Sequence, residues 1–456
     1  MKTLAEKTRA REPRRDWAQV NPCVCCAPLG AALAFKGIEG GMSLLHGSQG
    51  CATYIRRYLI SHFREPVDIA SSSFSEDTVV FGGAANLAQA IRSIRKTYNP
   101  AVLGIATTCL AETIGEDLVM TLAALRDELQ GGAIIVPVST PAYRDGHATG
   151  FAAAAEAAMN ILAKPDGSAS PVGILPGMVS PEDLRYCKDI AAAFGQPVTV
   201  FPDYSATLDG GPWDRYHALP PGGTPRREVE NLASARMLFD WTAPAEGICG
   251  RLIERFGTPA IHSAPPIGIA ATDEFLDRLG AVWGIPMPEA LHNERARLLD
   301  AYVDGHKYLS GLRVAVCCDE PLVTGLVRFC AEIGLAPVLV ATARGVPGFD
   351  AKIRASIAEA GAVDDLQVLS DADFDEIDGH LEAAKVDLCI GTSKLYKSAR
   401  KAGAPLVRVG FPIHDRFGAA RILHIGYRGG LQLYDRIVNA VIEKKQESSN
   451  EQWSYL

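Results

Sequence analysis

The sequence lacks any long uninterrupted apolar run. No hydrophobic stretch approaches the roughly 18 residues that a membrane-spanning helix requires, although hydrophobic residues make up 48% of the chain. The N-terminal stretch MKTLAEKTRAREPRRDW is basic but lacks the apolar centre of a secretory signal peptide. We therefore expect a cytoplasmic protein with no membrane partner.

Positive charge is also scarce. The 45 Lys and Arg residues are outnumbered by 53 Asp and Glu residues, which gives a net charge of -8, so nucleic acid is not an expected partner. No G-x-x-x-x-G-K-S/T motif is present, so any ATP would be bound by a different protein. No C-x-x-C-H motif occurs either, so the signature of a covalently attached haem is missing.

Cysteine, by contrast, is abundant, with 11 residues in the chain. In a reducing compartment these residues are thiols or metal ligands rather than disulfides. Their odd total also does not suit a fully paired set. Metal binding is therefore the first function to consider.

Short apolar runs alternate with segments of helical spacing along the chain. Runs of this length are typical of buried parallel strands, and we predict strands at 101–106, 133–138, 172–175, 198–201, 313–317, 337–341, 386–390 and 405–409. The helices predicted between or beside them are 111–129, 151–163, 181–194 and 322–333. This alternation predicts an α/β fold with doubly wound parallel sheets.

The length of 456 residues exceeds what one hydrophobic core can organise. A stretch rich in Pro, Gly, Ser and Asp at 164–171 is typical of a linker. We predict a flexible N-terminal arm at 1–20, followed by three Rossmann-like domains at 21–164, 165–310 and 311–456. The first of these would carry the metal-binding residues.

Three cysteines stand where structural elements are expected to end. Cys26, Cys51 and Cys109 each lie beside Gly, Pro or a small polar residue, which lets a backbone approach an inorganic ligand closely. We interpret them as thiolate ligands of an iron-sulfur cluster. Because such clusters usually take four protein ligands, another polypeptide would complete the shell.

The C-x-x-C formed by Cys23 and Cys26 leaves other interpretations open. It could be half of a zinc site or a redox pair. A zinc site would need a second C-x-x-C or an H-x-x-x-H at a compatible spacing, and neither occurs. A zinc-stabilised α/β binding protein is thus only the third alternative, after the two functions described below.

Five motifs in one order carry a family resemblance. They are NPCVCCAPLGA, HGSQGC, HFREP, SSSFSEDTVVFGG and TTCLAETIGEDL, and weaker similarity continues through APLVRVGFP and GYRGG. Together they resemble the β-type subunit of nitrogenase component 1. The resemblance covers nearly the whole chain.

The resemblance implies a β-type subunit of an oxidoreductase. Cys26, Cys51 and Cys109 match the family cysteines that hold one half of a P-cluster (8Fe-7S), or here a 4Fe-4S cluster, shared with an α-type subunit. The implied assembly is an α2β2 heterotetramer, to which a P-loop iron protein binds transiently and delivers electrons. The substrate-reducing cofactor would lie in the α-type subunit, so no catalytic residue is assigned here. Cys23 and Cys25 would be structural.

The sequence departs from the family in two ways. Gly146 stands where nitrogenase has a serine that can bind the oxidised cluster, and Asp145 is the adjacent alternative. The segment before the first cysteine is also short. The short segment and the C-terminal text look more like the β-type subunit of a cofactor-assembly scaffold, which is the alternative. Scaffold chains commonly lack one or more of the three cysteines, so the complete set here favours an electron relay, as in a nitrogenase-like reductase such as methylthio-alkane reductase.

The other cysteines fall within or beside apolar segments, where a buried inert thiol is expected. They are Cys187, Cys249, Cys317, Cys318, Cys330 and Cys389. Cys249 is of special interest because the related α-type chains bind their cofactor through a lone cysteine in a comparable region, but no matching histidine context is recognisable. His46 is expected to be hydrogen-bonded within a turn rather than to bind metal.

Overall fold

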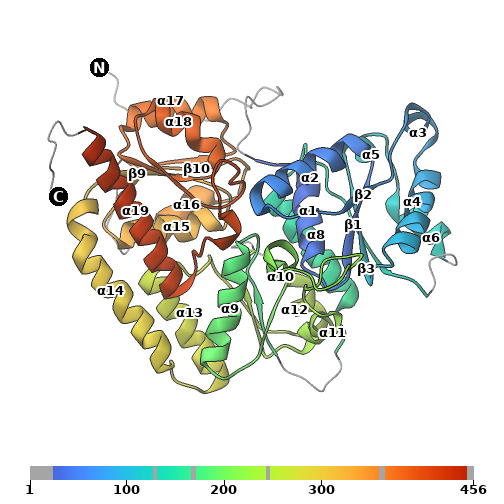
Figure 1. Cartoon of the computed structure of the whole chain (residues 1–456), viewed down its shortest axis with the longest axis horizontal. Coiled ribbons are helices and arrows are strands. Elements are labelled where there is room, and N and C mark those ends of the chain that lie inside the picture. The colour runs from blue at the N-terminus through green and yellow to red at the C-terminus, as the bar shows by residue number, and fades with distance from the viewer. Residues whose placement is uncertain (1–23, 127–130, 166–170, 243–246, 359–364, 449–456) are drawn as a thin grey trace.

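The fold contains three parallel β-sheets, each flanked by helices. A computed structural model describes residues 24–126, 131–165, 171–242, 247–358 and 365–448. We call 24–165, 171–309 and 310–448 the first, second and third regions, each of which carries one sheet (Figure 1). The predicted α/β class with three parallel-sheet domains is confirmed. The domain boundaries stay a prediction, and the proposed arm at 1–20 and Cys23 lie outside the described residues.

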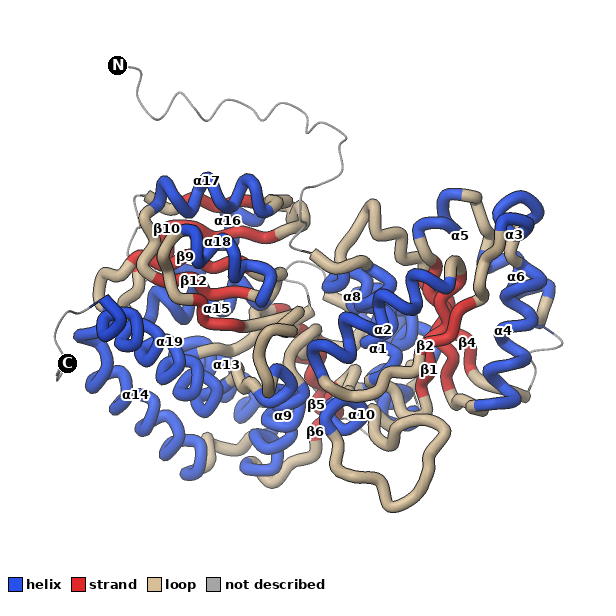
Figure 2. The backbone as a smooth tube through the Cα atoms, turned by 45° about the horizontal axis from the view of Figure 1, so that its top comes forward, coloured by secondary structure: helices blue, strands red, loops and turns tan. Residues whose placement is uncertain are grey.

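The first sheet has the strand order β2 (Ile69–Ser71), β1 (Gly41–His46), β3 (Val102–Thr107) and β4 (Ile134–Val138). Its central strands β1 and β3 are buried along their whole length. Leu44 and Ile105 pack with α4 (Ala84–Thr97) on one face, whereas Leu45 packs on the opposite face. Figure 2 shows α1, α2 and α8 on one side of this sheet and α4 and α6 on the other.

Helices α1 (Ala27–Lys36) and α8 (His147–Leu162) cross at very short range. A Cβ atom at Gly30 would lie 1.7 Å from the carbonyl oxygen of His147, and one at Gly150 would lie 2.0 Å from that of Ala27. Only glycine permits this approach. The crossing therefore fixes the start of α1 against the start of α8.

The second and third sheets repeat the parallel arrangement. The second has the order β6 (Val198–Val200), β5 (Val172–Leu175), β7 (Met237–Asp240) and β8 (Ala260–His262). The third has the order β11 (Gln367–Ser370), β10 (Ala336–Thr342), β9 (Arg313–Cys317), β12 (Leu388–Gly391) and β13 (Leu406–Arg408). The first and second regions share one hydrophobic core, and most of the third packs separately.

The remaining described helices cover these sheets and connect the regions. They are α2 (Gln49–Phe63), α3 (Glu76–Phe81), α5 (Cys109–Thr113), α6 (Leu118–Ala124), α9 (Pro181–Ala193), α10 (Ser205–Asp209), α11 (Arg226–Asn231), α12 (Gly250–Phe256), α13 (Gly268–Trp283), α14 (Glu289–Leu309), α15 (Leu322–Glu332), α16 (Phe349–Ile357), α17 (Phe374–Ala384), α18 (Tyr396–Lys401) and α19 (Gly426–Ser448). The C-terminal α19 packs against α13 and α14 and so ties the end of the chain to the second region. Within the described parts of the chain, no helix is both long and apolar enough to cross a membrane.

One sequence prediction about this fold is wrong. The single helix expected at 111–129 is divided into α5 and α6, and its last part lies outside the described residues. Gly115 adopts a φ of +77°, which ends the first segment. The Asp117 side chain then accepts the Met120 backbone N–H at 2.8 Å and caps α6.

Candidate functional site

Cys26, Cys51 and Cys109 all lie where helices begin. Cys26 immediately precedes α1, Cys51 is in the first turn of α2, and Cys109 is the first residue of α5. Helix α2 follows β1 and α5 follows β3, and these two strands pair in parallel. Their carboxyl ends therefore bring two cysteines from distant sequence positions to one edge of the sheet.

This edge is also where the strand order reverses. Chain order runs outward from β1 to β2 on one side and from β3 to β4 on the other. In open parallel sheets, ligands bind in the crevice outside the carboxyl ends of the two strands at such a switch point. Cys51 and Cys109 follow these two strands.

The three cysteines line one open pocket of about 950 Å³. The same wall includes Pro28, Ser48 and Thr108 from the first region. The opposite wall comes from the third region, and its residues include Phe374, Ser393, Lys394, Tyr396, His414 and Asp415. The structure thus brings the predicted ligands together in a space large enough for a metal cluster.

Exposure separates these cysteines from the others. Among the ten cysteines in the described parts of the chain, Cys26, Cys51 and Cys109 are partly exposed. The other seven are buried: Cys25, Cys187, Cys249, Cys317, Cys318, Cys330 and Cys389. Burial was predicted for all of these except Cys25. Among the described cysteines, those that an external ligand can reach therefore all line this pocket.

A backbone hydrogen bond is directed at one of the sulfurs. The Ala142 N–H donates to Cys109 Sγ at 3.2 Å. Arg344, from the third region, fixes this segment by donating to the carbonyl oxygens of Ala142 at 2.7 Å and Asp145 at 3.2 Å. Such hydrogen bonds to sulfur are among the factors that set the potential of an iron-sulfur centre.

A buried histidine holds the segment before Cys26, and the sequence analysis missed it. His147 Nδ1 accepts the Cys25 backbone N–H at 3.2 Å, and the backbone N–H of His147 donates to the Cys25 carbonyl oxygen at 2.9 Å. Because Nδ1 accepts, the imidazole proton is on Nε2, which lies 2.9 Å from Asp319 Oδ2. Asp319 in the third region is thereby linked to the backbone beside a candidate ligand.

Burial disfavours the thiolate form of Cys26 and Cys51 in the absence of a metal. Burial raises the pKa of Cys26 to about 12, and the nearby sulfurs of Cys51 and Cys109 add to this shift. Burial also raises the pKa of Cys51, with Cys109 as a second cause. Iron binding would therefore displace protons, since the thiolate is the ligand.

Two further sequence positions can now be placed. Gly146 pairs with Cys26 in an isolated antiparallel bridge, and a Cβ atom there would lie 2.3 Å from Val24 Cγ2. Asp145 is not among the residues that line the cysteine pocket. His46 is fully buried, with Nδ1 3.1 Å from Ser72 Oγ and Nε2 3.3 Å from Glu116 Oε2, so it is hydrogen-bonded as expected, but at the end of β1 and to residues distant in sequence rather than within a turn.

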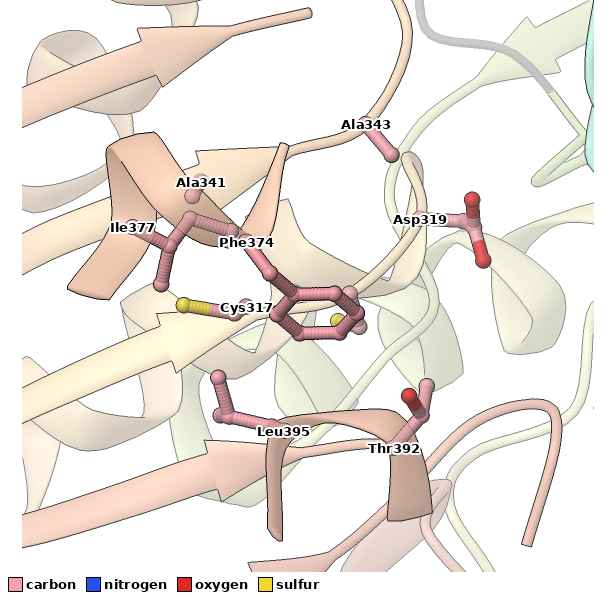
Figure 3. A pocket seen from close by; sticks show the side chains of 9 residues that line it. Cys317, Asp319, Ala341, Ala343, Phe374, Ile377, Thr392 and Leu395 are labelled. Atoms are coloured by element: carbon pink, nitrogen blue, oxygen red, sulfur yellow. The ribbon is translucent and has the colours of Figure 1, made fainter. Parts of the chain in front are cut away.

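The corresponding edge of the third sheet is closed. Cys317 ends β9 and Cys318 follows it at the switch point between β9 and β12, but the pocket there measures only about 10 Å³. Figure 3 shows the Phe374 ring extending into this space beside Cys317. Two neighbouring cavities, lined by residues of all three regions, hold about 20 and 30 Å³. Spaces of this size hold a water molecule or two and no cofactor.

Comparison with known proteins adds to this geometry. A family model described as "Nitrogenase component 1 type Oxidoreductase" matches residues 26–442. The nitrogenase molybdenum-iron protein beta chain of Clostridium pasteurianum is 34% identical over 444 residues, covering 96% of both chains. That of Frankia alni is 36% identical over 450 residues, covering 96% of this chain and 85% of the relative.

Solved structures of nitrogenase chains have a similar fold. The fold resembles nitrogenase Cp1 at pH 6.5 with a TM-score of 0.92 and 32% identity, covering 99% of this chain and 100% of that one. A second solved chain, nitrogenase Cp1 at pH 5, has a TM-score of 0.73 at 17% identity and covers 96% of this chain and 92% of that one. This second likeness concerns the fold alone.

Proposed function

Since this chain belongs to the nitrogenase component 1 type oxidoreductases, as a β-type subunit, we propose that it holds one half of an iron-sulfur cluster. Cys26, Cys51 and Cys109 are the ligands. The cluster is of the P-cluster type (8Fe-7S) or a 4Fe-4S cluster, and the α-type partner completes its shell. In this function the subunit relays electrons to a metal cofactor in that partner.

One observation carries the proposal: the three partly exposed cysteines meet on one open pocket. A single ion would need its ligand atoms close together, and these three sulfurs do not form such a group among the described residues. Wider spacing suits a cluster, in which each thiolate binds a different iron. The open side of the pocket is where the partner's ligands enter.

The residues of this chain have definite tasks in such a relay. Cys26, Cys51 and Cys109 provide thiolates near helix starts, where the helix dipole favours negative charge. The Ala142 N–H stabilises charge on Cys109 Sγ. His147 and Arg344 fix the two backbone segments that border the sulfurs. The bound cluster supplies one-electron transfer.

The proposal also assigns the partners. The half-site needs a second chain, and the family resemblance implies an α-type subunit in an α2β2 heterotetramer. The resemblance also implies a P-loop iron protein that delivers electrons transiently, and the sequence has no P-loop motif of its own. The substrate-reducing cofactor belongs to the α-type subunit, in agreement with the small volume of the central cavities here.

The test is a comparison of two cysteine variants in the purified complex. Cys51→Ala should remove iron and sulfide from the subunit interface and abolish reduction that depends on the iron protein and ATP. Cys317→Ala, at the closed edge of the third sheet, is the matched control and should retain both. Full iron content and turnover in the Cys51→Ala complex would contradict the proposal.

A second measurement separates the relay from the assembly scaffold. The native complex is supplied with the iron protein, ATP and a reductant, and turnover of small reducible substrates is followed. In parallel, the complex is mixed with a cofactor-free acceptor of the same family. Turnover supports the relay, whereas activation of the acceptor without turnover would assign the chain to a scaffold.

A further inference from the structure

A second group of potential metal ligands lies in the second region. Asp240 and His262 are the last residues of β7 and β8, and they are register partners in that parallel pair. Cys249 immediately precedes α12, the helix that follows β7. All three side chains therefore meet at the carboxyl edge of the second sheet, which is the usual ligand-binding edge of such sheets.

The distances suit a small tetrahedral ion. Cys249 Sγ lies 3.2 Å from Asp240 Oδ2, and Asp240 Oδ2 lies 3.6 Å from His262 Nδ1. Zinc bonded to sulfur, nitrogen and oxygen in tetrahedral geometry places its ligand atoms about 3.4–3.6 Å apart. Among the described residues, one set of three or more His, Cys, Asp or Glu side chains has its ligand atoms within 4.8 Å of one another, and it consists of Asp240, Cys249 and His262.

Two details point to an absent ligand. His262 Nδ1 is buried and makes no hydrogen bond, since Asp240 Oδ2 at 3.6 Å lies beyond hydrogen-bond distance. Gly247, with a φ of +57°, closes the group so tightly that a Cβ atom would lie 2.0 Å from Asp240 Oδ2 and 2.5 Å from His262 Nδ1. The buried nitrogen thus lacks the partner that a satisfied core histidine has.

The rest of the group is held in place. Asp240 Oδ1 accepts the Thr242 N–H at 2.9 Å, and Oδ2 accepts the Ile248 N–H at 2.8 Å. Fixed hydrogen bonds of this kind orient a metal-binding carboxylate. Asp240 and Cys249 are fully buried, whereas 22% of the His262 side chain is exposed and leaves a route for a small ion.

We propose that Asp240 Oδ2, Cys249 Sγ and His262 Nδ1 bind one divalent ion of the zinc class, with water as the fourth ligand. Binding replaces the S–H bond of Cys249 with a metal–sulfur bond and releases one proton to solvent. A Cys-His-Asp nucleophile is the rival chemistry, but no exposed surface of Cys249 is available to a substrate. The site is separate from the cysteine pocket and does not depend on the proposed electron relay.

The experiment measures zinc in the purified complex. Wild-type complex is incubated with zinc, washed exhaustively and analysed for zinc per chain by mass spectrometry. Cys249→Ser keeps the side-chain size and His262→Gln changes a partly exposed residue, so both should fold. The matched controls are Cys187→Ser, another buried thiol, and His306→Gln, an exposed histidine.

We expect one zinc per chain in the wild type and both controls, and at least about tenfold weaker binding in the two site variants. Zinc-edge X-ray absorption should show one sulfur, with nitrogen and oxygen as the other ligands. Equal zinc in all variants, no retained zinc in the wild type, or a shell of several sulfurs would each overturn the proposal. The last result would place the zinc in the cysteine pocket.

Discussion

The switch points of the first and third sheets differ, although both sheets are parallel and both reverse their strand order between two central strands. In both, cysteines lie at or shortly beyond the carboxyl ends of these strands: Cys51 and Cys109 in the first region, and Cys317 and Cys318 in the third. The pocket around Cys51 and Cys109 measures about 950 Å³, and the one around Cys317 about 10 Å³ (Figure 3). The strand order thus produces a switch point in both sheets, and the size of the side chains in adjoining segments determines whether the pocket there is open.

The cause of the difference lies in the residues after the strands. In the first region β1 is followed by Gly47, Ser48 and Gly50, which take little space. In the third region Phe374 and Leu395 fill the equivalent space from neighbouring segments. Thiol labelling tests this comparison directly, and three further experiments test the contacts that hold the first region and its junction with the third region.

The largest expected difference is in thiol reactivity. In chain freed of metal, iodoacetamide should label Cys51 and Cys109 at least about 100-fold faster than Cys317 and Cys318, since buried thiols react only when the structure opens. Mass spectrometry of peptides after timed quenching measures this. Equal labelling rates in folded protein would show that the third pocket is open too.

A larger residue at the α1–α8 crossing should destabilise the protein. Gly30→Ala places a Cβ atom against the His147 carbonyl, and we expect a loss of about 3 kcal/mol in the free energy of unfolding. Gly379→Ala in α17 is the matched control, because nothing lies within 4 Å of its Cβ position. That change should be neutral or stabilising by about 0.5–1 kcal/mol.

Urea denaturation of both variants measures the difference. If Gly30→Ala were as stable as the wild type, the two helices would not be as close as described.

Acid should loosen the contact between the first and third regions. His62 Nδ1 accepts the Ile413 N–H at 2.8 Å, and burial lowers the pKa of His62 to about 3. The folded state therefore favours the neutral ring, so stability is complete above the unfolded pKa of about 6.5 and falls as the pH drops toward 3. We expect a loss of about 2 kcal/mol between pH 7 and pH 5 from this group.

His62→Gln should reduce that pH dependence, whereas His306→Gln, at an exposed position, should preserve it. Unfolding curves at several pH values measure the slope. An unchanged slope in His62→Gln would refute the assignment.

The smallest effect is expected at the link between Asp319 and His147. Asp319→Ala removes the carboxylate 2.9 Å from His147 Nε2, which should cost about 1 kcal/mol. A double-mutant cycle with His147→Gln should give a coupling energy of similar size. Additive effects would show that the two side chains do not interact.

The sequence predicts strands well where they are continuous apolar runs. The strand at 313–317 was predicted at its observed bounds, because it is a dense apolar run between polar segments. By contrast β1, GMSLLH, was not predicted, since its glycine and serine interrupt the pattern. The predicted helix at 111–129 was wrong because Gly115 takes a left-handed conformation that spacing alone does not show.

The same contrast applies to the candidate site. Cys26, Cys51 and Cys109 stand in short motifs, so they can be found by reading the sequence. The contact of His147 with Asp319, and the meeting of Asp240, Cys249 and His262, depend on packing and strand register. Such contacts join residues of different structural elements, and no short motif marks them.

The cysteine pocket has one wall made of residues near the C-terminus, including Lys394, His414 and Asp415. A nascent chain presents its three N-terminal sulfurs to the cell long before those residues leave the ribosome. During that interval the thiols have no enclosing surface and are open to oxidation or to stray metals. If the pocket holds the proposed cluster, its loading has to wait until translation has finished and the last third of the chain has folded back.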